Sequence, residues 1–124
     1  MNEAALKKQF TFIARSAPYG TNRPQLCLDM ALATAVFEQE VNYLFMGDGV
    51  FQLVRGQNAE GIASKTLGNA METLDLYGIE SVLVEREALS SRSLNEKDLL
   101  LPVTLAEPDD IRSLLQRSDC VFNL

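Results

Sequence analysis

The fold is decided by the stretch Val41-Asn42-Tyr43-Leu44-Phe45-Met46-Gly47-Asp48-Gly49. Its first six residues are nearly all apolar, which is typical of a β-strand covered on both faces in a parallel sheet. Gly47 and Gly49 then let the backbone turn sharply and approach a neighbour closely. Because parallel α/β sheets meet ligands and partners at the carboxyl ends of their strands, Asp48 marks a candidate functional edge. Alternatively, Asp48 only accepts hydrogen bonds from loop amides or caps a helix.

Outward from this stretch, predicted strands alternate with predicted helices. Further strands are predicted over Gln9–Arg15, Ser81–Val84, Leu99–Val103 and Cys120–Leu124. Pro102 indicates that the third of these lies at a sheet edge or that the proline stands at a terminal position of the strand. Helices are predicted after Thr21 or Asn22, from Asn58 to Gly78, over Arg86–Ser90 and from Pro108. This alternation requires right-handed crossovers and helices on both faces of a mainly parallel sheet. We therefore predict one α/β domain over residues 1–124, a flavodoxin-like three-layer sandwich of about five strands, with residues 1–8 as a flexible extension.

Apolar spacing predicts which helix faces are buried. The predicted core positions are Leu26, Met30, Ala33 and Phe37 in the first helix, Ala63, Leu67, Ala70, Met71 and Leu74 in the second, and Ile111, Leu114 and Leu115 in the last. Asp109 and Asp110 suit the positive end of the last helix.

Composition excludes several classes of function. The chain has 124 residues, 17 acidic against 11 basic, and its net charge of −6 disfavours direct binding to nucleic acid. It has no histidine and two cysteines, so the usual zinc spacings and Ser-His or Cys-His pairs are excluded, and no metal or cofactor is expected. No apolar run reaches the roughly 18 residues of a membrane span, and the N-terminus lacks a signal-peptide pattern. We expect a cytoplasmic protein without membrane contact.

Three segments together resemble a known family: Ala17-Pro18-Tyr19-Gly20-Thr21, Asp48-Gly49-Val50-Phe51-Gln52-Leu53 and Leu76-Tyr77-Gly78-Ile79-Glu80. From about Phe10 to Leu124 the chain resembles the TusC/DsrF branch of the DsrE-like sulfur-relay proteins. The resemblance implies a DsrE-like domain in a cytoplasmic heterohexamer, with TusD/DsrE-like and TusB/DsrH-like sister subunits. Such a complex passes persulfide sulfur from an upstream to a downstream carrier protein, for 2-thiouridine at tRNA wobble positions in the Tus version and for intracellular sulfur oxidation in the Dsr version.

The same resemblance indicates where a sulfur-carrying cysteine is missing. Members that transfer sulfur carry it just after the third strand, where this chain has Val84 and Glu85. Persulfide chemistry needs a thiolate, which neither residue supplies. We therefore expect a non-catalytic subunit, serving tRNA thiolation or alternatively sulfur oxidation. Asp48, Gly49, Phe51 and Gln52 are expected to shape the edge that meets a sister subunit or frames its active cysteine.

Two other hypotheses stay open. The chain is itself a thiol sulfurtransferase working through Cys120, or it is a homo-oligomeric module that binds a small anion at the loops after its first two strands. Cys27 is expected to be a half-buried structural thiol, and core packing is also the plainer expectation for Cys120. The apolar residues Val50, Phe51 and Leu53, and the terminal Val121–Leu124, either contact a partner or fold back on their own core.

Overall fold

Five parallel strands form one sheet in the order β4-β3-β2-β1-β5. They are β1 (Gln9–Ala14), β2 (Glu40–Phe45), β3 (Ser81–Glu85), β4 (Thr104–Ala106) and β5 (Cys120–Asn123). The structure is a computed structural model, and it describes residues 8–18, 20–54, 71 and 73–124. The prediction of a mainly parallel sheet of five strands is confirmed. Residues 1–7 of the expected N-terminal extension and most of the helix predicted from Asn58 to Gly78 lie outside the described residues.

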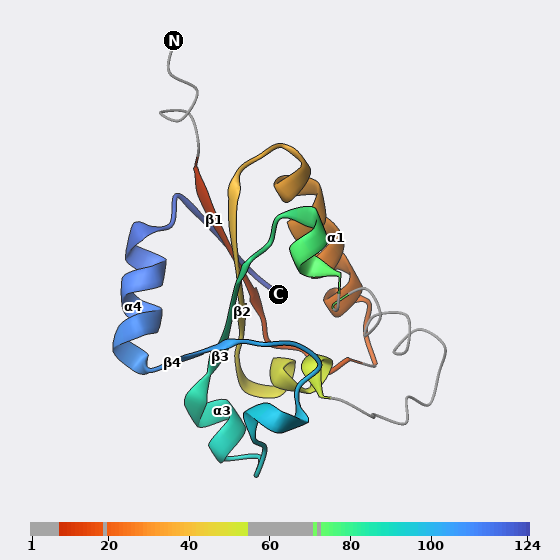
Figure 1. The fold of residues 1–124 in the computed structure, drawn as a ribbon, viewed down its shortest axis with the longest axis vertical. Coiled ribbons are helices and arrows are strands. Elements are labelled where there is room, and N and C mark those ends of the chain that lie inside the picture. Colours follow the sequence, from red (N-terminus) through yellow and green to blue (C-terminus); the bar gives the residue numbers. More distant parts are fainter. Residues whose placement is uncertain (1–7, 19, 55–70, 72) are drawn as a thin grey trace.

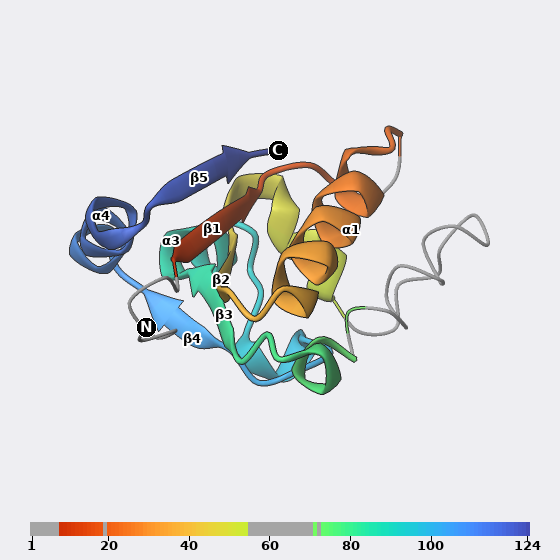
Figure 2. The ribbon, with the colours of Figure 1, turned by 90° about the horizontal axis from the view of Figure 1, so that it is seen from above.

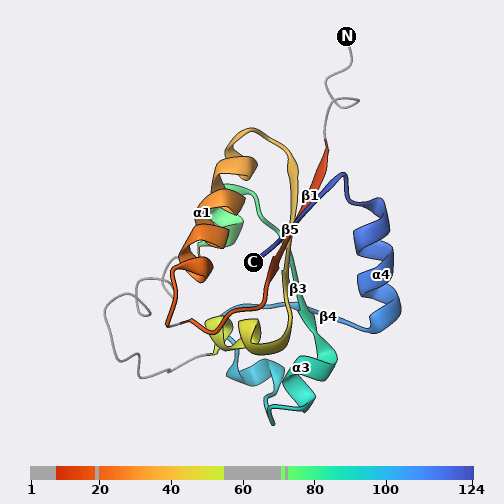
Figure 3. The same ribbon diagram turned by 180° about the vertical axis from the view of Figure 1, so that it is seen from behind.

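Helices cover both faces of the sheet, as predicted. Figures 1 and 3 show α1 (Arg23–Val36) on one side and α4 (Pro108–Arg117) on the other. The short α3 (Arg86–Ser90) follows β3 at the carboxyl ends of the strands, and η4 (Glu96–Asp98) comes between α3 and β4. Two 3₁₀ helices, η2 (Gly47–Leu53) and η3 (Leu74–Tyr77), lie after β2 and before β3, and η3 stops at Gly78 as expected.

The core is divided by the sheet. Successive side chains of a strand point to opposite faces, so Phe12 and Tyr43 pack with α1 while Ile13 and Leu44 pack with Leu114 of α4. Leu114 is fully buried and Ile111 and Leu115 pack beside it, which confirms the predicted face of the last helix. The Phe122 ring stacks on Phe12 with a centroid distance of 5.1 Å, so part of the apolar C-terminus does fold back on its own core.

The predicted core face of α1 is wrong except at Met30, which is partly buried and packs against the core. Its buried residues are Pro24, Cys27, Leu28 and Ala31, whereas Ala33 is exposed, Leu26 is 44% exposed and Phe37 76% exposed. Apart from Arg23, Gln25 and Asp29, the residues of this helix are apolar or small, so the spacing fits more than one stripe and the packing against β1 and β2 decides between them. Cys27 lies on the selected stripe and is fully buried rather than half-buried.

The predicted strand at Leu99–Val103 is also wrong. The strand is Thr104–Ala106, which follows Pro102 and pairs with β3 at one edge of the sheet. Leu99 instead forms an isolated antiparallel bridge with Val54, and its side chain is buried in the core. The Leu100 amide donates to the Leu53 carbonyl at 2.7 Å. The apolar run therefore closes the core beside η2 without joining the sheet. In residues 8–18, 20–54 and 73–124, no helix is both long enough and apolar enough to cross a membrane.

Candidate functional site

The turn after β2 is built on two glycines. Gly47 has φ +51°, and a Cβ atom on Gly49 would lie 1.9 Å from the Ala14 carbonyl oxygen. The Met46 amide donates to that same carbonyl at 3.0 Å, so the turn is held directly against the end of β1. The expectation that glycine permits a close approach here is confirmed, and it fixes where Asp48 projects.

Asp48 forms an ion pair with Arg92, a residue that sequence reasoning missed. The Nε and Nη2 atoms of Arg92 both donate to Asp48 Oδ1, at 3.2 and 2.9 Å. The same guanidinium lies 6.0 Å from the centroid of the Phe51 ring, and its Nη1 donates to the Ala88 carbonyl and the Ser91 hydroxyl. The Asp48 side chain remains 62% exposed and that of Arg92 25% exposed. Arg92 thus ties the turn after β2 to α3 and leaves the Asp48 carboxylate facing solvent.

The position of the expected family cysteine lies beside this ion pair. Glu85 ends β3, and its carboxylate accepts a hydrogen bond of 3.2 Å from the Gly47 amide. Arg86, the next residue, opens α3 and is paired with Glu107. The carboxyl end of β3 therefore presents a bonded carboxylate and a paired guanidinium at the position where the resemblance places the cysteine of sulfur-transferring members.

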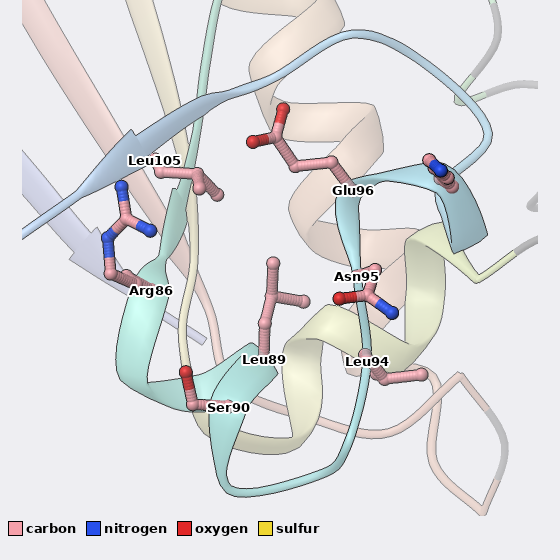
Figure 4. A pocket seen from close by; sticks show the side chains of 8 residues that line it. Arg86, Leu89, Ser90, Leu94, Asn95, Glu96 and Leu105 are labelled. Carbon is pink, nitrogen blue, oxygen red and sulfur yellow. The ribbon is translucent and has the colours of Figure 1, made fainter.

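A pocket of about 410 Å³ opens next to that position. Figure 4 shows Leu89, Leu94 and Leu105 around its apolar part, with Arg86, Asn95 and Glu96 at its edge. The pocket lies where α3, η4 and β4 meet, at the carboxyl end of β3. Its charged residues are of both signs, so its lining does not select a cation or an anion. Within the described part of the chain, no group of three His, Cys, Asp or Glu side chains is placed to hold a metal ion.

The four predicted edge residues differ in accessibility. Asp48 is exposed and Phe51 is partly exposed, but Gly49 is buried and Gln52 is only 3% exposed. The Gln52 amide nitrogen donates to the Ser16 carbonyl at 2.8 Å, and its Oε1 is buried with no hydrogen-bond partner in the described part of the chain. Of the two alternatives for Val50 and Leu53, packing in the chain's own core is confirmed and partner contact is wrong, since both side chains are fully buried. Of the four predicted edge residues, only Asp48 and Phe51 are therefore accessible at the surface.

The two cysteines lie away from this edge. Burial raises the pKa of the Cys27 thiol above its ordinary value of 9.0, and the neighbouring Tyr43 hydroxyl offsets part of that rise. Cys120 is partly buried at the first residue of β5, opposite Phe10 near the start of β1. Because the strands are parallel, Cys120 lies toward the amino end of the sheet and Asp48 at its carboxyl end. Both thiols are free.

Comparison with known proteins agrees with this architecture. A family model described as the DsrE/DsrF-like family matches residues 8–124. A TusC homolog of Vibrio parahaemolyticus is 34% identical over 110 residues, covering 89% of this chain and 93% of that protein. The intracellular sulfur oxidation protein DsrF of Allochromatium vinosum is 40% identical over 93 residues, covering 75% of this chain and 68% of that protein.

Two further matches extend over nearly full lengths. A TusC homolog of Pseudomonas aeruginosa is 33% identical over 119 residues, which cover 96% of this chain and all of that protein. The crystal structure of the ychN protein from E. coli superimposes with a TM-score of 0.78 at 21% identity, covering 94% of this chain and 99% of that one. The latter likeness shows that the fold is shared. From the family match and the relatives above 30% identity, the chain belongs to the DsrE/DsrF-like family.

Proposed function

We propose that this chain is a non-catalytic, TusC/DsrF-like subunit of a cytoplasmic persulfide-relay complex. Its partners are a cysteine-bearing TusD/DsrE-like subunit and a TusB/DsrH-like subunit, and the assembled complex exchanges sulfur with upstream and downstream carrier proteins. Relatives named TusC homolog, matched over 93% and 100% of their lengths, support this assignment. The observation that carries it is the carboxylate of Glu85 at the end of β3, hydrogen-bonded to Gly47, where a relay member would carry its thiol.

The surroundings of Glu85 also disfavour the ionised form of any thiol that another chain would bring to this position. Glu85 and Glu87 are negative and raise the pKa of a thiol brought near them, because they destabilise a second negative charge. Arg86 would offset that effect, but its guanidinium is already paired with Glu107. Cys27 is fully buried in the core. A relay through this chain alone would therefore have to use Cys120, toward the other end of the sheet from Asp48.

The edge formed by Asp48 and Phe51 is the surface that we assign to a sister subunit. Asp48 Oδ1 accepts both bonds from Arg92 and the side chain is 62% exposed, so the carboxylate can also accept a donor from a neighbouring chain. Arg92 reaches Phe51 as well, so the two partner-facing groups are held together. Gly49 and Gln52 support this turn from below, because Gly49 packs against Ala14 at the end of β1 and Gln52 donates to the Ser16 carbonyl just after it.

For the pathway, we propose 2-thiouridine formation at tRNA wobble positions. The near-complete coverage of the TusC homologs supports it. The alternative is a DsrF-like role in sulfur oxidation, favoured by the 40% identity to a protein of that name over a shorter span. Sister-subunit genes beside genes for dissimilatory sulfite reductase would indicate the second role.

The test is to produce the chain alone and together with its two sister subunits, and to expose both preparations to a persulfide donor. We expect a stable complex in which mass spectrometry finds the added sulfur on a sister subunit and none on Cys27 or Cys120. Cys120→Ser is the matched variant, and it should leave transfer by the complex unchanged. Stoichiometric persulfide on Cys120 of the isolated chain, with transfer lost in Cys120→Ser, would establish the sulfurtransferase hypothesis instead.

A further inference from the structure

A second apolar surface lies at the other end of the sheet from Asp48. We call it the α1–η3 surface, and it consists of Val36 (66% exposed), Phe37 (76%), Leu76 (79%) and Tyr77 (50%). Single exposed apolar residues are ordinary, but large side chains exposed on adjacent segments mark interaction sites. Two of the four are aromatic, and aromatic residues are enriched at protein interfaces.

The two segments lie side by side. Figures 1, 2 and 3 all show η3 next to the C-terminal half of α1, and the two helices are in contact. Leu74, at the start of η3, is 2% exposed and anchors this turn in the core shared with α1. The Leu76 amide donates to the Thr73 carbonyl at 3.0 Å and the Gly78 amide to the Asp75 carbonyl at 3.1 Å. The backbone that presents Leu76 and Tyr77 is thus ordered before any partner binds, which lowers the entropic cost of association.

Acidic residues border this surface. Glu38 and Glu40 follow Phe37, Asp75 lies within η3 next to Leu76, and Glu80 follows η3; all four are exposed. Lys8 lies beside this group, because the Glu40 amide donates to its carbonyl and its own amide donates to the Gln39 side chain. Within the described residues, four negative charges against that one positive charge make the border acidic, and the chain as a whole carries −6.

This charge pattern selects the kind of partner. Two copies of the surface facing one another would place acidic borders in contact, and like charges across an interface disfavour association. A partner with an apolar patch bordered by Lys and Arg would bury the four apolar side chains and pair the border at the same time. The pattern therefore favours a different chain over a second copy of this one.

We propose that the α1–η3 surface is a second subunit interface, which binds a sister subunit through an apolar patch bordered by basic residues. This inference rests on the proposed function, and it assigns the chain two contact surfaces, at opposite ends of the sheet. A subunit with contact surfaces at both ends of its sheet can hold two neighbouring subunits together, which is a structural role that needs no reactive thiol.

The test measures binding of the full chain to the purified subcomplex of its two sister subunits. The variant is Phe37→Ser/Leu76→Ser, whose side chains are too exposed to be needed for folding, and the matched control is Leu26→Ser, near the other end of α1. We expect the double variant to weaken binding by about tenfold or more and the control to leave it unchanged. Glu38→Lys/Glu80→Lys should slow association and reduce its dependence on salt, because it removes charges that steer the partner.

The outcomes separate this inference from the proposed function. If the unaltered chain binds the subcomplex and Phe37→Ser/Leu76→Ser binds equally well, the α1–η3 interface is wrong while the proposed function stands. If the unaltered chain binds no sister subunit, both are wrong. If the chain forms a homodimer that Phe37→Ser/Leu76→Ser dissociates, a second copy covers the surface and the assignment to a sister subunit is overturned.

Discussion

Gly49 and Asp48 are neighbours in the chain but contribute to the candidate edge in different ways. Gly49 matters for what it lacks: a Cβ atom there would meet the carbonyl carbon and oxygen of Ala14 at 2.6 and 1.9 Å. Both are backbone atoms of a strand paired on its two sides, so they cannot move aside cheaply. Asp48 matters for its exposed carboxylate, and its ion pair with Arg92 adds little stability because exposed pairs are screened by water.

We expect Gly49→Ala to lower the free energy of unfolding by about 3 kcal/mol, the scale of severe overpacking. Gly20→Ala is the matched control. Gly20 has φ +98° and a Cβ atom there would meet nothing within 4 Å, so only backbone strain of about 1–2 kcal/mol is added. Urea denaturation followed by circular dichroism measures both variants. Equal losses in the two would show that the contact with Ala14 does not constrain the turn.

For single residues, the sequence predicts the local backbone geometry better than it predicts which distant side chains come into contact. The pattern Gly47-Asp48-Gly49 after an apolar run predicts a sharp, close turn, because glycine's freedom is a local property. Arg92 is 44 residues away from Asp48, and nothing in the residues around it distinguishes it from another exposed arginine. The sequence left open whether Val50 and Leu53 contact a partner or pack in the core, because the same apolar residues fit an exposed loop and a buried 3₁₀ helix; the structure buries both.

Among the elements, α1 shows why the buried face of a mostly apolar helix is hard to predict from residue spacing. Residues Leu26, Met30, Ala33 and Phe37 have helical spacing, but so do Cys27, Ala31 and Thr34, and the structure buries the stripe that includes Cys27, Leu28 and Ala31. A helix with clear polar positions leaves less choice. In α4 the charged residues Asp109, Asp110 and Arg112 restrict the apolar face to Ile111, Leu114 and Leu115, and that prediction is confirmed.

The orientation of α1 predicts opposite outcomes for two leucines two residues apart. Leu28→Ala should lower the free energy of unfolding by about 3 kcal/mol, because it removes a fully buried side chain and leaves a cavity against the sheet. Leu26→Ala should change it by less than about 0.5 kcal/mol, because that side chain is 44% exposed. Denaturant titration of the two variants side by side is the measurement. A larger loss for Leu26→Ala would restore the stripe predicted from spacing.

The short edge strand β4 carries a similar lesson about runs of apolar residues. Leu99-Leu100-Leu101 reads as a strand, but burial of Leu99 is achieved by a bridge to Val54 outside the sheet, and pairing begins only at Thr104, after Pro102. A run of apolar residues indicates that some of its side chains are buried, but it does not indicate whether its backbone joins the sheet. Which backbone partner buries them depends on contacts between distant parts of the chain, which periodicity does not contain.

For the three-layer architecture as a unit, alternation of strands and helices was sufficient. Short connections and right-handed crossovers leave few arrangements for such a pattern, which is why the parallel sheet with α1 and α4 on opposite faces follows from the sequence. The order β4-β3-β2-β1-β5 places β1 and β2, the most buried strands, at the centre. The same arrangement brings the Cys27 thiol of α1 beside the Tyr43 hydroxyl of β2 in the middle of the core.

That buried pair makes the stability of the folded chain depend on alkaline pH. Burial raises the pKa of the Cys27 thiol above 9.0, and burial together with the Cys27 thiol raises the pKa of Tyr43 well above 10.0. Above these ordinary values the unfolded chain releases protons that the folded chain retains, so the unfolded state gains stability relative to the folded one. The free energy of unfolding should thus be unaffected by these groups near neutral pH. It should fall above about pH 9, by up to about 1.4 kcal/mol per pH unit for each group.

Two variants separate the contributions of Cys27 and Tyr43 to the slope of the free energy of unfolding against pH. Cys27→Ala should remove the part that begins near pH 9, and Tyr43→Phe the part that begins near pH 10, because each deletes one of the protons that folding retains. The comparison uses slopes of the free energy of unfolding against pH, so a cavity left by Cys27→Ala shifts the curve without changing its shape. If Cys27→Ala and Tyr43→Phe both keep the full alkaline slope, the two groups release their protons as readily in the folded chain as in the unfolded one, and a dry, closed core between α1 and β2 is wrong.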